Sequence, residues 1–198
     1  MGIALKRTFF VFIILIASGS IRAQVFVIPQ GGLNLSEFSF IKDNYTATTS
    51  VGYQAGALAR FGKNAFLQTG LLFSQFSNEI SYSDSLINIK GPLTVRGLLM
   101  PLQVGFNLYN ADIIRLRIMA GINLSFPLTI DENVFLIEKS NFKTSNIGAA
   151  IGFGFDIFRF VMDANFSFGM NDMASVNGTN VSLKLYTFSI GYLIGDAY

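Results

Sequence analysis

The residues of this sequence best suited to chemistry are three arginines and two aspartates set within apolar segments: Arg60, Arg115, Arg117, Asp156 and Asp163. Arg115 and Arg117 are two positions apart, so an extended strand presents both side chains on the same face. Guanidinium and carboxylate groups that share a face can pair with each other, or they can line a path for ions. The elements that carry these residues decide between the two uses.

Other kinds of chemistry are limited by what the sequence lacks, since it contains no histidine and no cysteine. Histidine is the usual general base near neutral pH, so its absence excludes His-dependent lipase, acyltransferase and protease mechanisms. The absence of cysteine excludes disulfides, thiolate metal sites and thiol catalysis. We therefore expect a protein that is not an enzyme and that has no cofactor.

The acidic residues Asp131, Glu132 and Glu138 offer one alternative, because carboxylates could serve a reaction or bind Ca²⁺. The ligand spacing of a calcium-binding loop is absent, however. A solvated acidic loop beside Lys139 and Lys143 is the better interpretation, and we predict no metal site.

The elements that must position the charges are β-strands. Between Ser145 and Met170, bulky apolar residues alternate with glycines, amides and charged residues, with one interruption at Phe158-Arg159. A period of two is typical of strands, whose successive side chains point to opposite faces. A barrel in water encloses its large apolar side chains, whereas a barrel in lipid has them outside. An arginine facing lipid near the midplane costs about 2–4 kcal/mol, so we expect the charges to face inward.

The same alternation continues along the chain and predicts an all-β fold, an eight-stranded antiparallel transmembrane β-barrel with a packed polar lumen. Short connections alternate with long ones, as in outer-membrane barrels, which have short periplasmic turns, long external loops and an even number of strands. Both termini are then periplasmic. The expected strands cover about 26–36, 50–61, 65–77, 95–108, 113–126, the two halves of 145–170, and 183–195. The short connections are 62–64, 110–112 and 158–159, and the long ones lie near 37–49, 78–94, 127–143 and 171–182.

Two features disturb the alternation. Phe66, Leu72 and Phe76 place large apolar groups on the inward parity of the third strand. Pro101 cannot donate a hydrogen bond to a strand ladder, so we expect a bulge or a strand end at this position.

Inside the barrel, the five charged residues named above are predicted to form a network, because buried charges need partners. Asp156 lies on the strand that follows Arg115 and Arg117, and is therefore their expected neighbour. About eight strands give an interior just wide enough for side chains to fill, so the favoured interpretation is that the network closes the lumen. The alternative is a narrow ion path. The amides expected to join the network are Gln54, Gln68, Gln103, Asn107, Asn123 and Asn165.

The N-terminus has the features of an export signal: Lys6 and Arg7 precede a short apolar segment, and Ala23 ends a plausible cleavage site. We predict a cleaved signal peptide at 1–23 and an outer-membrane barrel domain at 24–198. Cleavage removes three of the 14 basic residues, leaving 11 against 12 acidic ones. A nucleic-acid role needs clustered Lys and Arg, which the sequence lacks, so we expect no nucleic-acid partner.

The sequence also resembles the PorT-like outer-membrane β-barrels. The matching segments are Gly31–Ser36, Leu98–Leu102, Gly121–Phe126 and Ile147–Asp156, whereas Leu71–Gln75 departs from the family pattern. The resemblance implies an outer-membrane barrel, and it implies partners in the cell envelope, because the family's namesake is implicated in type IX secretion of surface proteins.

These observations together predict an integral barrel of the outer membrane, surrounded by outer-membrane lipid, with a non-enzymatic structural or interaction role. A link to type IX secretion follows from the resemblance. The alternative function is a narrow channel for small solutes or ions. The sequence leaves the oligomeric state open.

Overall fold

The computed structural model describes residues 24–40, 45–84, 87–111, 113–131, 145–170, 174–176 and 179–195. The predicted signal peptide, residues 1–23, lies outside this part of the chain, as do Glu132 and Glu138. Among the described residues, no helix is long and apolar enough to cross a membrane.

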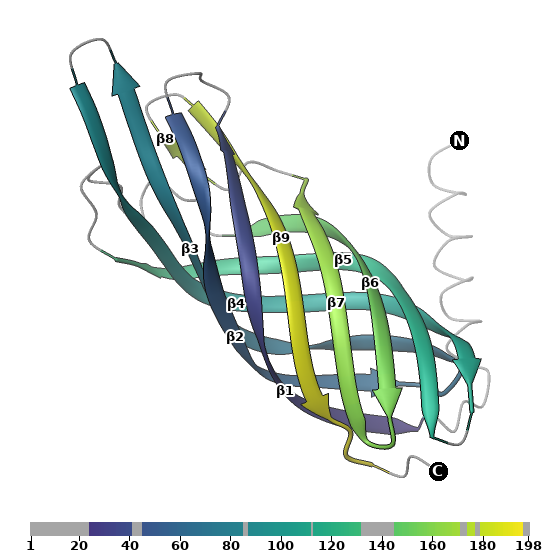
Figure 1. Cartoon of the computed structure of the whole chain (residues 1–198). Helices are drawn as coiled ribbons and strands as arrows, with labels where there is room; N and C mark the ends of the chain where they lie inside the picture. Colours follow the sequence, from purple (N-terminus) through teal and green to yellow (C-terminus); the bar gives the residue numbers. More distant parts are fainter. Residues whose placement is uncertain are drawn as a thin grey trace, which may run out of the picture.

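The described residues form β-strands that close into a barrel (Figure 1). The strands are β1 Val25–Phe40, β2 Tyr45–Phe61, β3 Ala65–Asp84, β4 Ile87–Asn110, β5 Ile114–Ile130, β6 Asn146–Ile157, β7 Phe160–Gly169, β8 Ala174–Val176 and β9 Thr179–Tyr192. Neighbours pair antiparallel, and β1 closes the barrel against β9, with Gln30 opposite Gly191. The three-residue β8 pairs with the start of β9. The wall of the barrel therefore has eight strands, which confirms the predicted fold.

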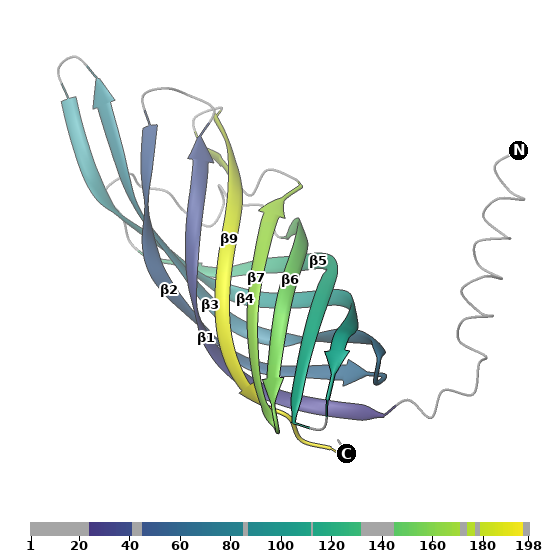
Figure 2. The ribbon, with the colours of Figure 1, turned by 45° about the vertical axis from the view of Figure 1, so that its right-hand side comes forward.

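Short turns join the strands at the end of the barrel where the chain enters β1 and leaves β9 (Figure 2). In the turn after β2, Gly62 has a φ of 110°, a left-handed conformation that favours glycine. Its N–H donates to the carbonyl oxygen of Gln24 at 3.0 Å, which ties the start of the barrel to this turn. Phe158, between β6 and β7, has a φ of 51°. The predicted tight turns at 62–64 and 158–159 are confirmed.

At the opposite end, several strands are longer than the sequence pattern predicts. β3 and β4 remain paired as far as Asp84 and Ile87, so most of the long connection predicted at 78–94 is strand, and the prediction was wrong there. The same holds for much of 37–49. The reason is that ladder hydrogen bonds hold such a ribbon together without any apolar alternation. As a result, β1 to β4 and β9 extend beyond β6 and β7 (Figures 1 and 2).

Pro101 lies within a continuous strand, and the bulge or strand end predicted there was wrong. It stays opposite Asn123 on β5, and the register shifts between β4 and β5 occur elsewhere, next to Arg96 and Asn107. Pairing with β3 is interrupted around Pro101 and resumes in the same register. The missing N–H therefore affects one side of β4, while the pairs above and below hold the strand in place.

Side chains alternate between a lipid-facing belt and the lumen, as predicted. On β6, for example, Ile147, Ile151 and Phe153 are exposed on the outer surface, whereas Asn146 and Asp156 are buried. The charged residues therefore lie on the face where their desolvation can be offset by partners.

The lumen is packed, but it is less polar than the alternation predicts. A cluster of buried apolar side chains lies inside the barrel, and most of them come from β1 to β4. Phe66, Leu72 and Phe76 are buried lumen residues that pair with β4 in one continuous register. Against β2, the register of β3 shifts between Gln75 and Asn78, next to Phe76. The cluster consists of Phe26, Ile28, Leu58, Leu72, Phe76, Leu99, Val161, Leu185 and Leu193.

Candidate functional site

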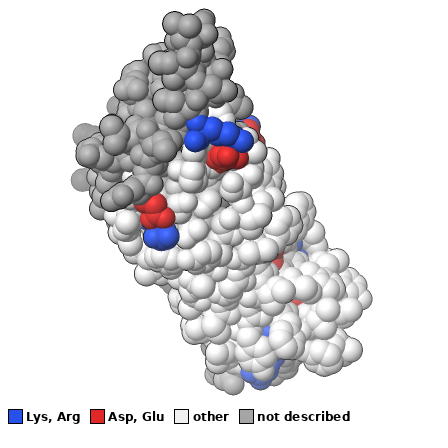
Figure 3. All heavy atoms as spheres, turned by 60° about the vertical axis from the view of Figure 1, so that its left-hand side comes forward, with Lys and Arg blue, Asp and Glu red and all other residues white. Residues whose placement is uncertain are grey.

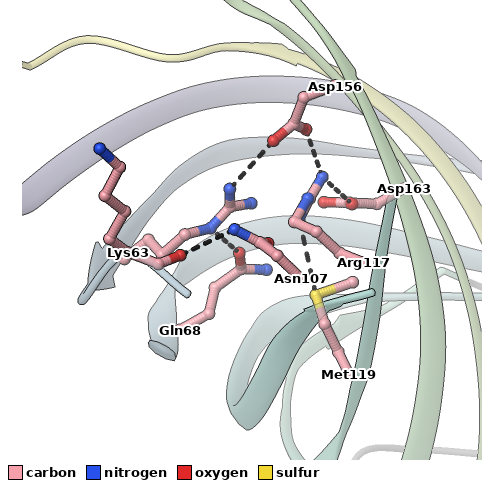
Figure 4. Close-up of polar contacts among 8 residues, drawn as sticks. Lys63, Gln68, Asn107, Arg117, Met119, Asp156 and Asp163 are labelled. Carbon is pink, nitrogen blue, oxygen red and sulfur yellow. Dashed lines mark hydrogen bonds and ion pairs between the residues drawn. The ribbon is translucent and has the colours of Figure 1, made fainter. Parts of the chain in front are cut away.

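The strongest concentration of buried charge is an ion-pair cluster inside the barrel (Figure 4). At its centre, Nη2 of Arg117 on β5 donates to Oδ1 of Asp156 at 2.5 Å and to Oδ1 of Asp163 at 2.9 Å. Arg117 is 1% exposed, and both aspartates are buried. Because Asp156 is on β6 and Asp163 is on β7, one guanidinium connects three consecutive strands.

The register of the strands explains how Arg117 reaches the second aspartate. Arg117 lies opposite Gly154 on β6, and Gly154 lies opposite Asp163 on β7. A Cβ atom at Gly154 would come within 2.5 Å of the Arg117 guanidinium carbon and 2.6 Å of Asp163 Oδ1. Glycine at this position therefore leaves the space in which the guanidinium meets both carboxylates.

Arg60 adds a contact from the opposite wall of the barrel. Its Nη1 lies 3.4 Å from Asp156 Oδ2, and its Nε donates to Gln68 Oε1 at 3.0 Å. Its guanidinium also lies 4.8 Å from the centre of the Phe66 ring, a cation–π contact. In the strand order, β2 and β6 are four strands apart in an eight-stranded wall. The Arg60–Asp156 pair therefore spans the lumen.

Arg115 is buried on the same inward face and lies opposite Asp156 in the β5–β6 register. All five residues of the predicted network are thus buried in the barrel, and direct ion pairs join Arg60, Arg117, Asp156 and Asp163.

The predicted amides divide into those near the cluster and those at its edges. Gln68 binds Arg60, and Gln103 donates to Asn165 Oδ1 at 3.4 Å. Asn107 instead lies near the short-turn end, where it donates to the carbonyl oxygen of Lys63 at 2.8 Å. The remaining predicted amides, Gln54 and Asn123, are buried.

A second polar group, nearer the long-strand end of the lumen, was not predicted as a cluster. Asn34 on β1 donates to Ser74 Oγ on β3 at 3.0 Å, and Asn78 donates to Ser36 Oγ at 2.8 Å. These hydrogen bonds connect β1 to β3 across the lumen face of β2, near the point where direct β1–β2 pairing ends at Ser36. The inward parity of Asn34 and Ser36 was the available signal, but polarity alone does not identify partners about 40 residues away.

A small cavity lies between these groups. The lumen contains a cavity of about 20 Å³, lined by Gln54, Leu72, Asn123 and Asp163 among others. A cavity of that size holds about one water molecule. The cluster can therefore neutralise charge and connect strands, but the cavity offers no room for an organic substrate.

The ion pairs at the long-strand end differ from the buried cluster in the lumen, because their side chains are half-exposed. Arg96 pairs with Asp131 at 2.9 Å, which places Asp131 in a salt bridge between β4 and the end of β5. Lys184 pairs with Glu37 at 3.1 Å across the β9–β1 closure. Figure 3 shows acidic and basic residues side by side toward this end and mostly uncharged residues over the rest of the visible face.

Comparison with solved structures found similar chains at low sequence identity. The chain is similar to Ail, the attachment invasion locus protein of Yersinia pestis, at 15% identity over 86% of this chain and 99% of that one, with a TM-score of 0.44. It is also similar to the translocator domain of the autotransporter NalP from Neisseria meningitidis, at 14% identity over 96% of this chain and 95% of that one, with a TM-score of 0.40. No curated protein matches the sequence.

A family model matches a much longer part of the sequence than any single motif does. The model of the outer membrane protein beta-barrel domain matches residues 22–175. This range includes the strands that carry all four residues of the ion-pair cluster. The chain belongs to the outer membrane protein beta-barrel domain family.

Proposed function

We propose that this outer-membrane barrel is a closed, non-enzymatic structural and interaction element, and that its function resides at its rims. The observation that carries this proposal is the filled lumen, in which the Arg60–Asp156 pair crosses from wall to wall. Breaking a buried ion pair by removing one partner costs about 3–5 kcal/mol, so this cluster resists rearrangement into an open path.

The competing function is a narrow channel for small solutes or ions. It would need a continuous polar path, but buried apolar side chains such as Leu58, Leu72 and Leu99 occupy the lumen beside the charges. Single-channel recording of the purified barrel in a planar bilayer tests this directly. We expect no stable conductance from the native protein or from Arg60→Ala, because the apolar cluster remains. Stable conductance steps in the native protein would contradict the closed lumen.

The rim that we propose as the interaction surface is the long-strand end. There β3 and β4 extend as a paired ribbon beyond the shorter β6 and β7, and long loops of outer-membrane barrels face outward. Lys90, exposed on this part of β4, pairs with Glu79 at 3.1 Å. The resemblance to PorT-like barrels supports a component of type IX secretion as the partner.

Because the chain has no cysteine, single-cysteine crosslinking can locate the partner. We propose Lys90→Cys as the probe of the long-strand end and Lys63→Cys, in an exposed short turn, as its matched control. With a thiol-reactive photocrosslinker in intact envelopes, Lys90→Cys is expected to capture a secretion component. Capture from Lys63→Cys alone would move the interaction to the periplasmic end, and capture from neither variant would contradict an interaction role.

A further inference from the structure

A hollow of about 700 Å³ lies on the outer surface of the barrel, in the lipid-facing belt. It is lined by residues of β4, β5, β6, β7, β9 and β1, and therefore includes the closure between the first and last strands. Volumes of roughly 300–1,000 Å³ are typical of small-molecule sites. The hollow is far larger than the cavity inside the lumen and has room for a ligand.

The hollow forms between two rows of outward side chains. One row contains Phe153, Ala164 and Phe188, which are neighbours across β6, β7 and β9. The side chain in the middle of this row, Ala164, is small and lies between two phenylalanines. The other row contains Phe155, Met162 and Ile190, again opposite one another.

The row continues onto β1, where Ile190 lies opposite Gly31, a residue with no side chain. Between the rows the floor is strand backbone, because Arg117, Asp163 and Ser189 point their buried side chains into the lumen.

The chemistry of the lining selects an apolar, flexible occupant. The side chains that rise around the hollow are aliphatic or aromatic, so they offer dispersion contacts and no charge for a polar ligand. The site is concave and belongs to the surface that faces the bilayer. A lipid chain can follow such a channel, whereas a second barrel would need a protruding ridge of matching shape.

The position of the hollow identifies the leaflet. Phe155 and Met162 flank the two-residue turn between β6 and β7, and Leu116 follows the turn between β4 and β5. Short turns of outer-membrane barrels are periplasmic. The hollow therefore lies in the periplasmic half of the belt, where the surrounding lipid is phospholipid.

We infer that this hollow is a binding site for an acyl chain of a phospholipid in the inner leaflet. The bound chain covers the β1–β9 closure at Gly31, Gly32 and Leu33, which pair with Ile190, Ser189 and Phe188. Between the Gln30–Gly191 pair and the isolated Val27–Ile194 bridge, the ladder of this closure is interrupted. The lipid thus packs against the paired part of the closure that adjoins this interruption.

Native mass spectrometry of the intact barrel, purified from outer membranes in a mild detergent, tests the inference. The native protein is expected to retain about one phospholipid, a value set by the volume of the hollow. Ala164→Phe fills the middle of the hollow and is expected to lose that phospholipid. Ala57→Phe is the matched control, since Ala57 is exposed on lipid-facing β2 and is not among the residues that line the hollow. It is expected to retain the phospholipid.

A second measurement applies even if Ala164→Phe does not insert. Ala164→Cys and Ala57→Cys, each carrying a thiol-reactive photocrosslinker, are irradiated after purification in detergent, and the adducts are weighed. A phospholipid adduct at position 164 but not at 57 supports the site. Equal phospholipid adducts at both positions, lipopolysaccharide at 164, a second copy of this chain at 164, or no adduct at either position would each overturn it.

Discussion

The wall formed by β1 to β4 and the wall formed by β5 to β7 fill the same lumen with different side chains. Inward positions on β1 to β4 include large apolar groups such as Ile28, Leu72 and Leu99, which pack together. Inward positions on β6 include Gly152 and Gly154, where an added Cβ would approach other side chains within 2.1 Å and 2.5 Å. Large side chains of β1 to β4 thus fill much of the lumen, whereas the glycines of β6 leave room for the charged side chains of β5 to β7.

This difference explains how the strands of the described part of the chain fill the lumen with their own side chains. A tightly packed interior needs large groups opposite small ones, since voids and overlaps both destabilise. Arg60 carries a buried charge on the β1 to β4 side: it reaches across to Asp156, so the two walls meet through an ion pair as well as through apolar contact. Substitutions in the two walls should therefore lower the free energy of unfolding for different reasons: loss of ion pairing in one wall and loss of apolar packing in the other.

The largest effect is expected from Arg117→Ala. This change leaves Asp156 and Asp163 without their shared guanidinium, and an uncompensated buried charge costs about 3–5 kcal/mol. Equilibrium unfolding by urea in lipid vesicles measures the change in free energy.

The matched control is Arg96→Ala, which breaks the half-exposed pair with Asp131 and should cost about 0–1 kcal/mol. Equal effects of the two substitutions would show that burial does not strengthen the Arg117 cluster.

A somewhat smaller effect is expected from Leu72→Ala in the apolar wall, because a Leu→Ala change at a buried position costs about 2–5 kcal/mol, including the cavity it leaves. The adjacent Leu71→Ala is the control: Leu71 is 51% exposed in the lipid-facing belt, where lipid can fill the space that the substitution creates. The same urea titration should therefore show a clear loss for position 72 and little for position 71. The reverse order would mean that the β3 register is shifted by one residue.

The contrast between Leu71 and Leu72 also shows what sequence can and cannot predict here. The alternation of side chains predicted the inward and outward faces of the strands, the short turns and the inward charges. It could do so because lipid on one side and a closed lumen on the other impose a strict period of two. It could not interpret Phe66, Leu72 and Phe76, because an apolar side chain suits a packed lumen as well as it suits lipid.

The partners inside the lumen were harder to predict than the inward direction of the side chains. That Arg117 would meet Asp163 across Gly154 depends on the register of three strands, which turn geometry sets and alternation alone does not. The full length of β3 and β4 was also missed, because a paired ribbon beyond the bilayer needs no apolar face to form its hydrogen bonds.

The smallest of these effects is expected from Gly154→Ala, which places a methyl group against the Arg117 guanidinium and should cost about 1–3 kcal/mol through overpacking. Gly31→Ala is the control, since the nearest heavy atom to its added Cβ is the Gln54 carbonyl oxygen at 3.8 Å, an ordinary contact.

The double substitution Gly154→Ala/Arg117→Ala then isolates the cause. If the guanidinium is what the methyl group meets, the cost of Gly154→Ala should nearly vanish in the Arg117→Ala background, because the clash has been removed. Additive losses would mean instead that the methyl group meets Asp163, whose Oδ1 the added Cβ would approach within 2.6 Å, rather than the guanidinium. Glycine at this position would then make room for the aspartate of β7 and not for the arginine of β5.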